Sequence, residues 1–239
     1  ITPETFYSRL KTSKTLPSSS QPSVMEFKQL FEEISKEAEA IVTVLVSSKL
    51  SGTVASAQSA ANELPHISIE IVDSLAGSMC LGFTVLAAAR AAAAGDSLEK
   101  IVAAAEQMKE ETKLIFIVDT LEFLHRSGRI SGGRRLLGTA LQIKPILHFE
   151  EGLIRPLSQA RTKRKALYKL IELAESHLAG KQMKEAAIVE IDCQEDCDKL
   201  EIMVRDRFAP ADIYRTGVSP VVGTIVGPGS IGLAYHTQN

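Results

Sequence analysis

Residues 40–53 read Ala-Ile-Val-Thr-Val-Leu-Val-Ser-Ser-Lys-Leu-Ser-Gly-Thr, and this stretch decides the fold. Its first half, residues 40–46, is rich in β-branched side chains and predicts a strand buried in a parallel sheet. The segment 53–64 that follows contains neither Gly nor Pro and predicts a helix. Residues 47–53 are therefore expected to form a turn that leads from a strand into a helix.

This turn carries hydroxyl side chains and one glycine at the start of the predicted helix. Backbone N–H groups in the first helical turn have no partner within the helix and carry partial positive charge. Gly52 would let a ligand approach the backbone closely, and Ser51 and Thr53 add hydroxyls. The turn is therefore a candidate site for a carboxylate or a phosphate. The alternative is that Ser51 and Thr53 only cap the helix, and the residues alone leave both interpretations open.

The composition is that of a globular protein with one or two domains. The chain has 239 residues, of which 45% are hydrophobic and 23% charged. A net charge of −2 and an aromatic content of 5% argue against a nucleic-acid partner. No signal peptide and no apolar run long enough to span a bilayer are visible, so we expect no stable membrane insertion. The chain begins at Ile1 rather than at Met, which leaves room for a preceding segment.

The cysteines bear on the compartment and on metal binding. Cys80, Cys193 and Cys197 are too few for a disulfide framework, so we expect a reducing, cytoplasmic environment. Cys193 and Cys197 lie four residues apart, but a metal site would need more ligands and no His pair lies near them. Neither a metal nor a cofactor is expected.

Strands and helices alternate through the first half of the chain. Predicted strands at 40–46, 67–73 and 113–118 are separated by predicted helices at 53–64, 79–94 and 98–111. This alternation indicates a parallel α/β sheet, in which successive turns reach the same edge. The turns at Ser51 and Ser74 should therefore lie side by side. The helix 79–94 is apolar almost all round, which predicts that it is buried.

Two helices are expected before the central strand. Thr2 and Pro3 signal the start of a short helix that runs to about Leu10. A polar loop then spans residues 11–22, and Ser23-Val24-Met25-Glu26 matches a capping box that starts the next helix. The hydroxyls of residues 18–20 therefore come just before a helix N-terminus.

The segment 119–138 is dense in Gly and Arg, and it is interpreted either as a solvated loop or as a source of an Arg that pairs with an oxyanion. A strand over 141–149 follows. A hairpin turn at 150–152 then connects 145–149 to 153–156. We accordingly expect a domain boundary that separates residues 1–148 from a smaller α/β domain, 149–239.

The second region continues with a helix over 161–178, strands at 185–192 and 212–216, and a helix at 194–208. Its first helix begins with the basic run Arg161-Thr162-Lys163-Arg164-Lys165. Cations at a helix start oppose the helix dipole, so this run either faces an anionic partner or forms a solvated surface. Residues 227–232, Gly-Pro-Gly-Ser-Ile-Gly, are expected to form a tight turn.

Four segments, taken together, resemble the DegV family over nearly the whole chain. They are Ser-Ser-Gln-Pro-Ser at 19–23, Ser-Ser-Lys-Leu-Ser-Gly-Thr at 47–53, Asp-Thr-Leu-Glu-Phe-Leu with Ser-Gly-Arg-Ile at 119–130, and the Gly-Pro-Gly-Ser-Ile-Gly segment at 227–232. The resemblance implies a two-domain α/β protein that binds one long-chain fatty acid in a tunnel between its domains. It also implies a carrier rather than an enzyme. Such a carrier presents the carboxylate to a separate fatty acid kinase, and the acyl phosphate serves phospholipid synthesis.

The resemblance also implies roles for particular residues. Ser19 and Ser51, the latter with Gly52 and Thr53, would bind the carboxylate. Arg129 would lie on the head-group side, and Arg161 with Arg164 would dock the kinase.

Two positions depart from the pattern of the family. Ser19 replaces the usual Thr and keeps the hydroxyl, whereas Ile225 replaces a His and loses a donor. The loss at Ile225 implies either a rearranged head-group network or a weakened kinase step. The first strand usual in the family is absent ahead of Ile1.

Two other functions remain open. One is a phosphotransferase related to dihydroxyacetone kinases, whose fold the family shares, although the chain shows neither a nucleotide loop nor a carboxylate cluster for Mg²⁺. The other is a carrier without kinase coupling, which Ile225 favours.

Overall fold

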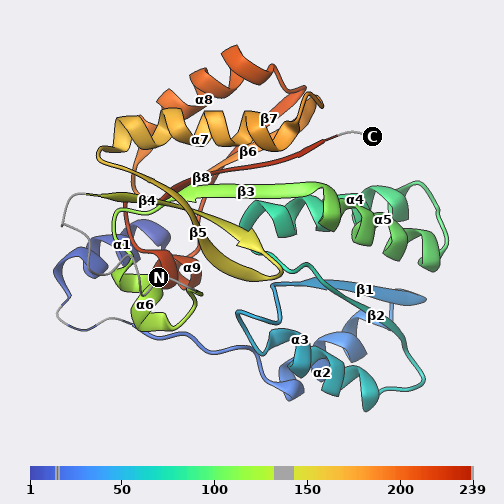
Figure 1. Ribbon diagram of the computed structural model, residues 1–239. Helices are drawn as coiled ribbons and strands as arrows, with labels where there is room; N and C mark the ends of the chain where they lie inside the picture. Colours follow the sequence, from blue (N-terminus) through green and yellow to red (C-terminus); the bar gives the residue numbers. More distant parts are fainter. Residues whose placement is uncertain (14, 16, 132–142, 238–239) are drawn as a thin grey trace. The chain divides into compact units, whose positions relative to one another are not determined.

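The chain forms two compact units of mixed α and β structure, shown in Figure 1. The computed structural model describes residues 1–13, 15, 17–131 and 143–237. The larger unit comprises Ile1–Ser19, Lys113–Glu150 and Ile154–Asn239, and the smaller unit comprises Ser20–Thr112 and Glu151–Leu153. The predicted fold class, α/β with two domains, is confirmed.

The smaller unit is built around a pair of parallel strands, β1 and β2. Its elements in chain order are α2 (Val24–Ile34), β1 (Ala40–Leu45), α3 (Thr53–Asn62), β2 (Ser68–Asp73), α4 (Ser78–Ala93) and α5 (Leu98–Glu111). The strands pair in register from Ala40 with Ser68 to Leu45 with Asp73. Each strand is followed by a helix, so the turns after β1 and β2 leave from the same edge.

Alternate side chains of these strands pack against different helices. Ile41 lies in a core with Phe27 and Phe31 of α2 and with Ala57 of α3. Val42 and Val44 of β1 pack instead against Ala88 of α4 and against side chains of α5. The pair of strands is therefore covered on both faces, which explains the nearly continuous apolar sequence of β1.

The larger unit contains a six-stranded sheet in the order β5-β4-β3-β8-β6-β7. Its elements are α1 (Pro3–Thr12), β3 (Thr112–Ile117), α6 (Glu122–Ser127), β4 (Lys144–Glu150), β5 (Leu153–Ala160), α7 (Lys163–Leu178), β6 (Met183–Glu190), α8 (Gln194–Phe208), β7 (Asp212–Gly217), α9 (Pro220–Val226) and β8 (Ile231–Thr237). Strand β6 is parallel to β7 and antiparallel to β8, and β3 is antiparallel to β4.

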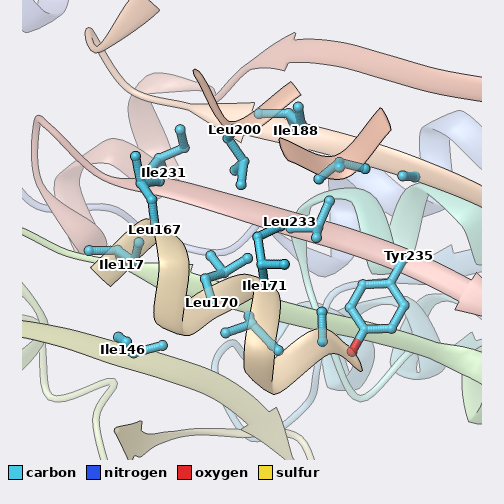
Figure 2. Packing of buried hydrophobic residues seen from close by; sticks show 14 of the residues in the cluster. Ile117, Ile146, Leu167, Leu170, Ile171, Ile188, Leu200, Ile231, Leu233 and Tyr235 are labelled. Carbon is cyan, nitrogen blue, oxygen red and sulfur yellow. The ribbon is translucent and has the colours of Figure 1, made fainter. Parts of the chain in front are cut away.

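The main core of this unit lies between the sheet and the helices α7 and α8. Figure 2 shows Leu167, Leu170 and Ile171 of α7 packed against Ile188 and Leu233 of the sheet. The buried residues of α7 recur every three or four positions, as expected for a helix with one apolar face: Ala166, Leu167, Leu170, Ile171, Ala174 and Leu178. Burial of this face against the sheet fixes the position of α7 and of the basic run at its start.

The structure divides the chain elsewhere than at the predicted boundary between residues 148 and 149. Strand β3 was expected in a sheet with β1 and β2, but it is hydrogen-bonded between β4 and β8. Residues on both sides of position 149 therefore belong to one sheet, and the unit that holds the C-terminal half is the larger one. The reason is that β3 finds its partners among strands far along the chain, a choice that local alternation does not reveal.

Helices α4 and α9 correct two further expectations. Helix α4 is not buried all round: Cys80, Phe83 and Ala88 face the interior, whereas Val85 is 42% exposed. The segment before the Gly-Pro-Gly turn was expected only to be apolar, but it forms α9, which accommodates Gly223 in its interior because the Tyr7 ring packs against that glycine.

The features predicted from residues close together in the sequence, namely helix caps and a hairpin turn, are present in the structure. Thr2 caps α1 and accepts from the N–H of Thr5, and Pro3 opens that helix. Glu151 and Gly152 both have positive φ, as a two-residue type I′ hairpin turn requires, so the predicted hairpin is confirmed. The capping box at α2 is also confirmed, because Ser23 accepts from the N–H of Glu26 while the Glu26 carboxylate accepts from that of Ser23 at 2.7 Å.

This capping box provides a test of local stability. Ser23→Ala removes the acceptor for the Glu26 N–H, and we expect it to lower the free energy of unfolding by about 1 kcal/mol. Ser59→Ala in the exposed middle of α3 is the matched control, and it should be neutral or slightly stabilising because Ala favours a helix interior. Urea denaturation followed by circular dichroism measures both, and equal effects of the two substitutions would contradict the capping role.

Candidate functional site

The turn after β1 is fixed at both ends by hydrogen bonds of Ser47. The Ser47 N–H donates to the carbonyl of Ala76 at 2.8 Å, and the Ser47 carbonyl accepts from the N–H groups of Leu50 and Ser51. The buried Ser47 hydroxyl donates to the carbonyl of Gly152 at 2.8 Å. Ser47 therefore shapes the turn and is not left available for a ligand.

Asp73, at the end of β2, joins the turn after β1 to the turn after β2. Its carboxylate accepts from the N–H of Ser48 at 3.2 Å and from the N–H of Leu75 at 3.0 Å. Ser74 completes the contact, because its N–H donates to the carbonyl of Leu45. The expectation that the two turns lie side by side is confirmed. The sequence placed Asp73 at the end of a predicted strand and did not reveal this function.

Helices α3 and α4 both begin at this joined edge without a capping side chain. Their N-cap residues are Gly52 and Gly77, and neither end has a side-chain capping hydrogen bond from its N-cap residue. The N–H groups of a first helical turn have no acceptor within the helix, so both ends carry partial positive charge. Two such ends in one unit favour the binding of an anion. The interpretation of Ser51 and Thr53 as ordinary N-caps is weakened, because the N-cap position belongs to Gly52.

The hydroxyls of Ser51 and Thr53 lie 2.7 Å apart and form a pair. Ser51 Oγ also accepts from the N–H of Thr53 at 3.3 Å. Each hydroxyl has one proton to donate, and the contact between them uses one of the two. The pair can therefore offer one O–H to an acceptor such as a carboxylate oxygen.

Gly52 is needed for a close approach and not for its backbone angles. Its φ is −73°, which any residue adopts. A Cβ at this position would lie 2.9 Å from Nε2 of Gln21, so the side-chain amide of Gln21 rests on the Gly52 backbone. Gln21 belongs to the Ser-Ser-Gln-Pro-Ser segment, which thus reaches the turn through its amide as well as through the hydroxyl expected of Ser19.

The turn after β2 also holds two residues in the left-handed region. Leu75 has φ of 49° and Ser78 has φ of 53°, although neither is glycine. Such conformations cost on the order of 1–3 kcal/mol each and persist only where the surroundings enforce them. Here the Asp73 carboxylate and the Ala76 carbonyl hold the turn, which supports a functional reason for its shape.

Ser19 and Arg129 belong to the larger unit, whereas Ser51, Gly52 and Thr53 belong to the smaller one. Ser19 is half-buried, and Arg129 follows Gly128, which ends α6 in the left-handed region. The Arg129 guanidinium donates to the carbonyl of Ser127, and the Arg129 N–H donates to the carbonyl of Leu124. The structure brings Ser51, Gly52 and Thr53 together, while the roles of Ser19 and Arg129 stay predictions. The rest of the Gly- and Arg-rich block, from residue 132, lies outside the described residues.

The basic run lies at the start of α7. Thr162 is the N-cap and accepts from the N–H of Lys165, so Arg161 precedes the helix and is exposed. The guanidinium carbon of Arg164 lies 5.9 Å from the centre of the Tyr168 ring. Lys163 turns toward the Gly-Pro-Gly turn, where it donates to the carbonyl of Gly229 and, at 3.3 Å, to Asp119.

Ile225, the position at which the resemblance implied a lost His, lies near the end of α9. The helix is held by Tyr7, whose hydroxyl donates to the carbonyl of Val218 at 2.7 Å. Burial raises the pKa of Tyr7 to about 12, so this hydroxyl stays protonated. At the other end of α9, Gly227 has φ of 82° and lies against Phe123. The backbone at this position is thus firmly held, and the apolar Ile225 side chain replaces the expected donor.

The chemistry available for metals is limited in the part of the chain that the structure describes. No group of three or more His, Cys, Asp or Glu side chains is placed to hold a metal ion there. Cys80 and Cys197 are buried, and burial raises the pKa of the Cys193 thiol to about 12. Among the helices of the described ranges, none is both long and apolar enough to cross a bilayer.

Comparisons with known proteins agree with the fold. A family described as "Uncharacterised protein, DegV family" matches residues 1–238. A DegV domain-containing protein from Clostridium acetobutylicum is 34% identical over 242 residues, which cover 100% of this chain and 84% of that protein.

Solved structures give the same result. A DegV family protein from Thermus thermophilus, described by its fatty acid binding, has 30% identity and a TM-score of 0.93, and the match covers 100% of this chain and 85% of that chain. DegV from Bacillus subtilis, described as a fatty acid binding protein, has 32% identity and a TM-score of 0.87, with 98% of this chain and 84% of that chain covered.

Gly52 and Gly227, two of the glycines against which other side chains pack closely, should differ in how well they tolerate replacement by Ala. We expect Gly227→Ala to cost roughly 2 kcal/mol or more, because it combines a positive φ with overlap of the Phe123 ring. Gly52→Ala should cost less than about 1 kcal/mol, because its φ is ordinary and the exposed Gln21 amide can move. Thermal or urea unfolding of the two variants measures the difference, and a Gly52→Ala loss equal to that of Gly227→Ala would contradict this view.

Proposed function

The chain belongs to the DegV family, and from this membership we propose that it binds one long-chain fatty acid and carries it without catalysing a reaction of its own. The observation that carries the proposal is the anion-binding arrangement at the edge of β1 and β2. There the hydroxyl pair of Ser51 and Thr53 lies at the start of α3, whose N-cap is Gly52, and α4 begins after the neighbouring turn with Gly77 as its N-cap. A single carboxylate is an anion of the size and charge that such an edge accepts.

The apolar tail and the carboxylate of a fatty acid place different requirements on its binding site. Each CH₂ group that leaves water contributes about 0.8 kcal/mol, so a long tail supplies most of the affinity. A carboxylate removed from water must receive hydrogen bonds, because an unpaired buried charge costs more than the tail can readily offset. The Ser51–Thr53 pair and the first-turn N–H groups of α3 supply such donors, and the polar end thus sets the orientation of the ligand.

Two further residues are proposed to contact the carboxylate. Ser19 would donate through its hydroxyl, as the resemblance implies, and Gln21, two residues along the chain, already lies against Gly52. Arg129 would add a cation, and a planar guanidinium suits a carboxylate well.

We further propose that the bound carboxylate is presented to a fatty acid kinase, and that the acyl phosphate formed serves phospholipid synthesis. Arg161 and Arg164 would dock the kinase. The support is that the cations of this run oppose the α7 dipole, so helix stability does not explain them. The carrier would act in the cytoplasm, where its three free cysteines stay reduced.

A second candidate is a carrier that has lost coupling to the kinase. Ile225 favours it, because an aliphatic side chain stands where the family pattern supplies an imidazole donor. Phosphorylation of the bound fatty acid by added kinase at the rate seen with a His-containing relative would exclude this candidate.

The binding proposal is tested by the ligand itself. Protein purified from its host is extracted with organic solvent, and the extract is analysed by mass spectrometry. We expect about one long-chain fatty acid per chain. Protein that carries no fatty acid, and that takes up none when incubated with oleate or palmitate, would refute the proposal.

The hydroxyl pair gives a more specific prediction. Ser51→Ala removes one donor from the carboxylate, and we expect fatty acid affinity to fall by about 1–3 kcal/mol. Displacement of a fluorescent fatty acid measures the change. Ser48→Ala in the same turn is the matched control, since this exposed residue contributes its backbone N–H to Asp73 and should leave affinity unchanged. Equal affinity of the Ser51→Ala variant and the unaltered protein would exclude the assigned role.

Charge reversal at Arg161 should separate docking from lipid binding. The side chain is exposed and precedes α7, so Arg161→Glu is expected to weaken kinase association while fatty acid affinity stays within about twofold. Surface plasmon resonance with the purified kinase and the displacement assay give the two values. A parallel loss of both would contradict the separation of these functions.

A further inference from the structure

A groove runs between α7 and α8 on the surface of the larger unit, where the two helices lie side by side in Figure 1. It encloses about 510 Å³. Leu167 and Met203 lie at its base and join the core beneath. Tyr168 and Ile202 border it and are 53% and 61% exposed, which places two large apolar side chains in water beside the groove.

The groove is locally positive, although the chain as a whole has a net charge of −2. Lys163, Arg164 and Lys199 line it together with one carboxylate, that of Asp196, and the Lys163 ammonium is already paired with Asp119. Lys199 is 60% exposed and lies 3.6 Å from Asp196 and 3.8 Å from Glu195. Exposed pairs this long are worth less than about 1 kcal/mol, so Lys199 can exchange them for a carboxylate of a partner.

Two further acids of α8, Asp198 and Glu201, are already paired with arginines. Glu201 pairs with Arg205 at 2.7 Å, and Asp198 pairs with Arg215 at 2.6 Å. Arg161 and Lys165 add positive charge at the same end of α7. The groove therefore combines an apolar base and border with cations at one end, and its occupant must be both apolar and acidic.

The shape decides between the anionic partners. A concave space between two helices accepts a convex object such as a third helix, whose side chains at i, i+3, i+4 and i+7 enter it. A flat membrane surface would leave the base of the groove unfilled.

We propose that the α7–α8 groove is the docking seat for an acidic amphipathic helix of a partner protein. Apolar side chains of that helix lie between Tyr168 and Ile202, and its carboxylates pair with Arg164 and Lys199. The inference rests on the proposed function only for the identity of the partner, which is the fatty acid kinase. The proposed kinase-docking surface thereby includes apolar residues of α8 as well as the basic run at the start of α7.

The experiment uses the full chain loaded with oleate and the purified fatty acid kinase of the same host. Isothermal titration calorimetry gives the affinity for the kinase, and mass spectrometry gives the fatty acid content of each variant. We expect Ile202→Ala, Tyr168→Ala and Lys199→Glu each to weaken kinase binding by about tenfold or more, with fatty acid content unchanged. Leu30→Ala and Lys100→Glu are matched controls on α2 and α5, because Leu30 is 48% exposed and Lys100 pairs with an acid one turn away.

The outcomes separate the two proposals. Absence of fatty acid from the protein would overturn the proposed function. Kinase binding that is unchanged by all three groove substitutions, or that falls equally with the controls, would overturn the docking seat alone. A loaded protein that does not bind the kinase at all would overturn the docking seat together with kinase coupling. If Ile202→Ala abolishes saturable binding to phosphatidylglycerol vesicles and leaves kinase binding intact, the groove binds a membrane surface. That result would refute the proposal that a partner helix occupies the groove.

Discussion

The carboxylate of Asp73 joins the two turns of the smaller unit on which the proposed ligand binding depends. It accepts from N–H groups of two successive turns, those of Ser48 and Leu75, and thereby fixes the end of β1 against the end of β2. The N–H of Ser47, which donates to the carbonyl of Ala76, and the N–H of Ser74, which donates to the carbonyl of Leu45, reinforce this link. A charged acceptor suits this position, because hydrogen bonds to an ionised group are the stronger ones.

In the larger unit, side-chain contacts hold the backbone of α9 and of the turn that follows it. Tyr7 and Phe123 pack against glycines of α9 and of the turn that follows it, and Lys163 ties the start of α7 to the same turn. The basic run and the Gly-Pro-Gly turn are thus parts of one framework. Ile225 lies on this framework near the end of α9, where a change of side chain can alter local chemistry while the backbone stays in place.

A comparison of individual residues in the sequence and the structure shows which features could be predicted from the sequence and which could not. The capping box of Ser23 and the hairpin at Glu151 depend on neighbours within a few residues, so they could be predicted. The strand partners of β3 could not, because β8 lies more than a hundred residues away and any apolar strand would satisfy the local pattern. The role of Asp73 and the contact of Gln21 with Gly52 were missed for a related reason: both arise only when separate segments meet. The groove between α7 and α8 likewise follows from the packing of two helices, although the charges that line it were visible from the start.

Strand β8 follows its partner β3 by more than a hundred residues, and this separation has a consequence for biosynthesis. Strand β3 can pair with β4 soon after both leave the ribosome, but its other edge must wait for β8. At about 5–20 residues per second, translation of the intervening segment takes on the order of ten seconds, during which an apolar edge stands open. The smaller unit, by contrast, draws nearly all of its residues from one continuous stretch and can mature early. Nascent chains are therefore expected to need chaperone protection until β8 has been made, and loss of β8 should be far more harmful than its seven residues suggest.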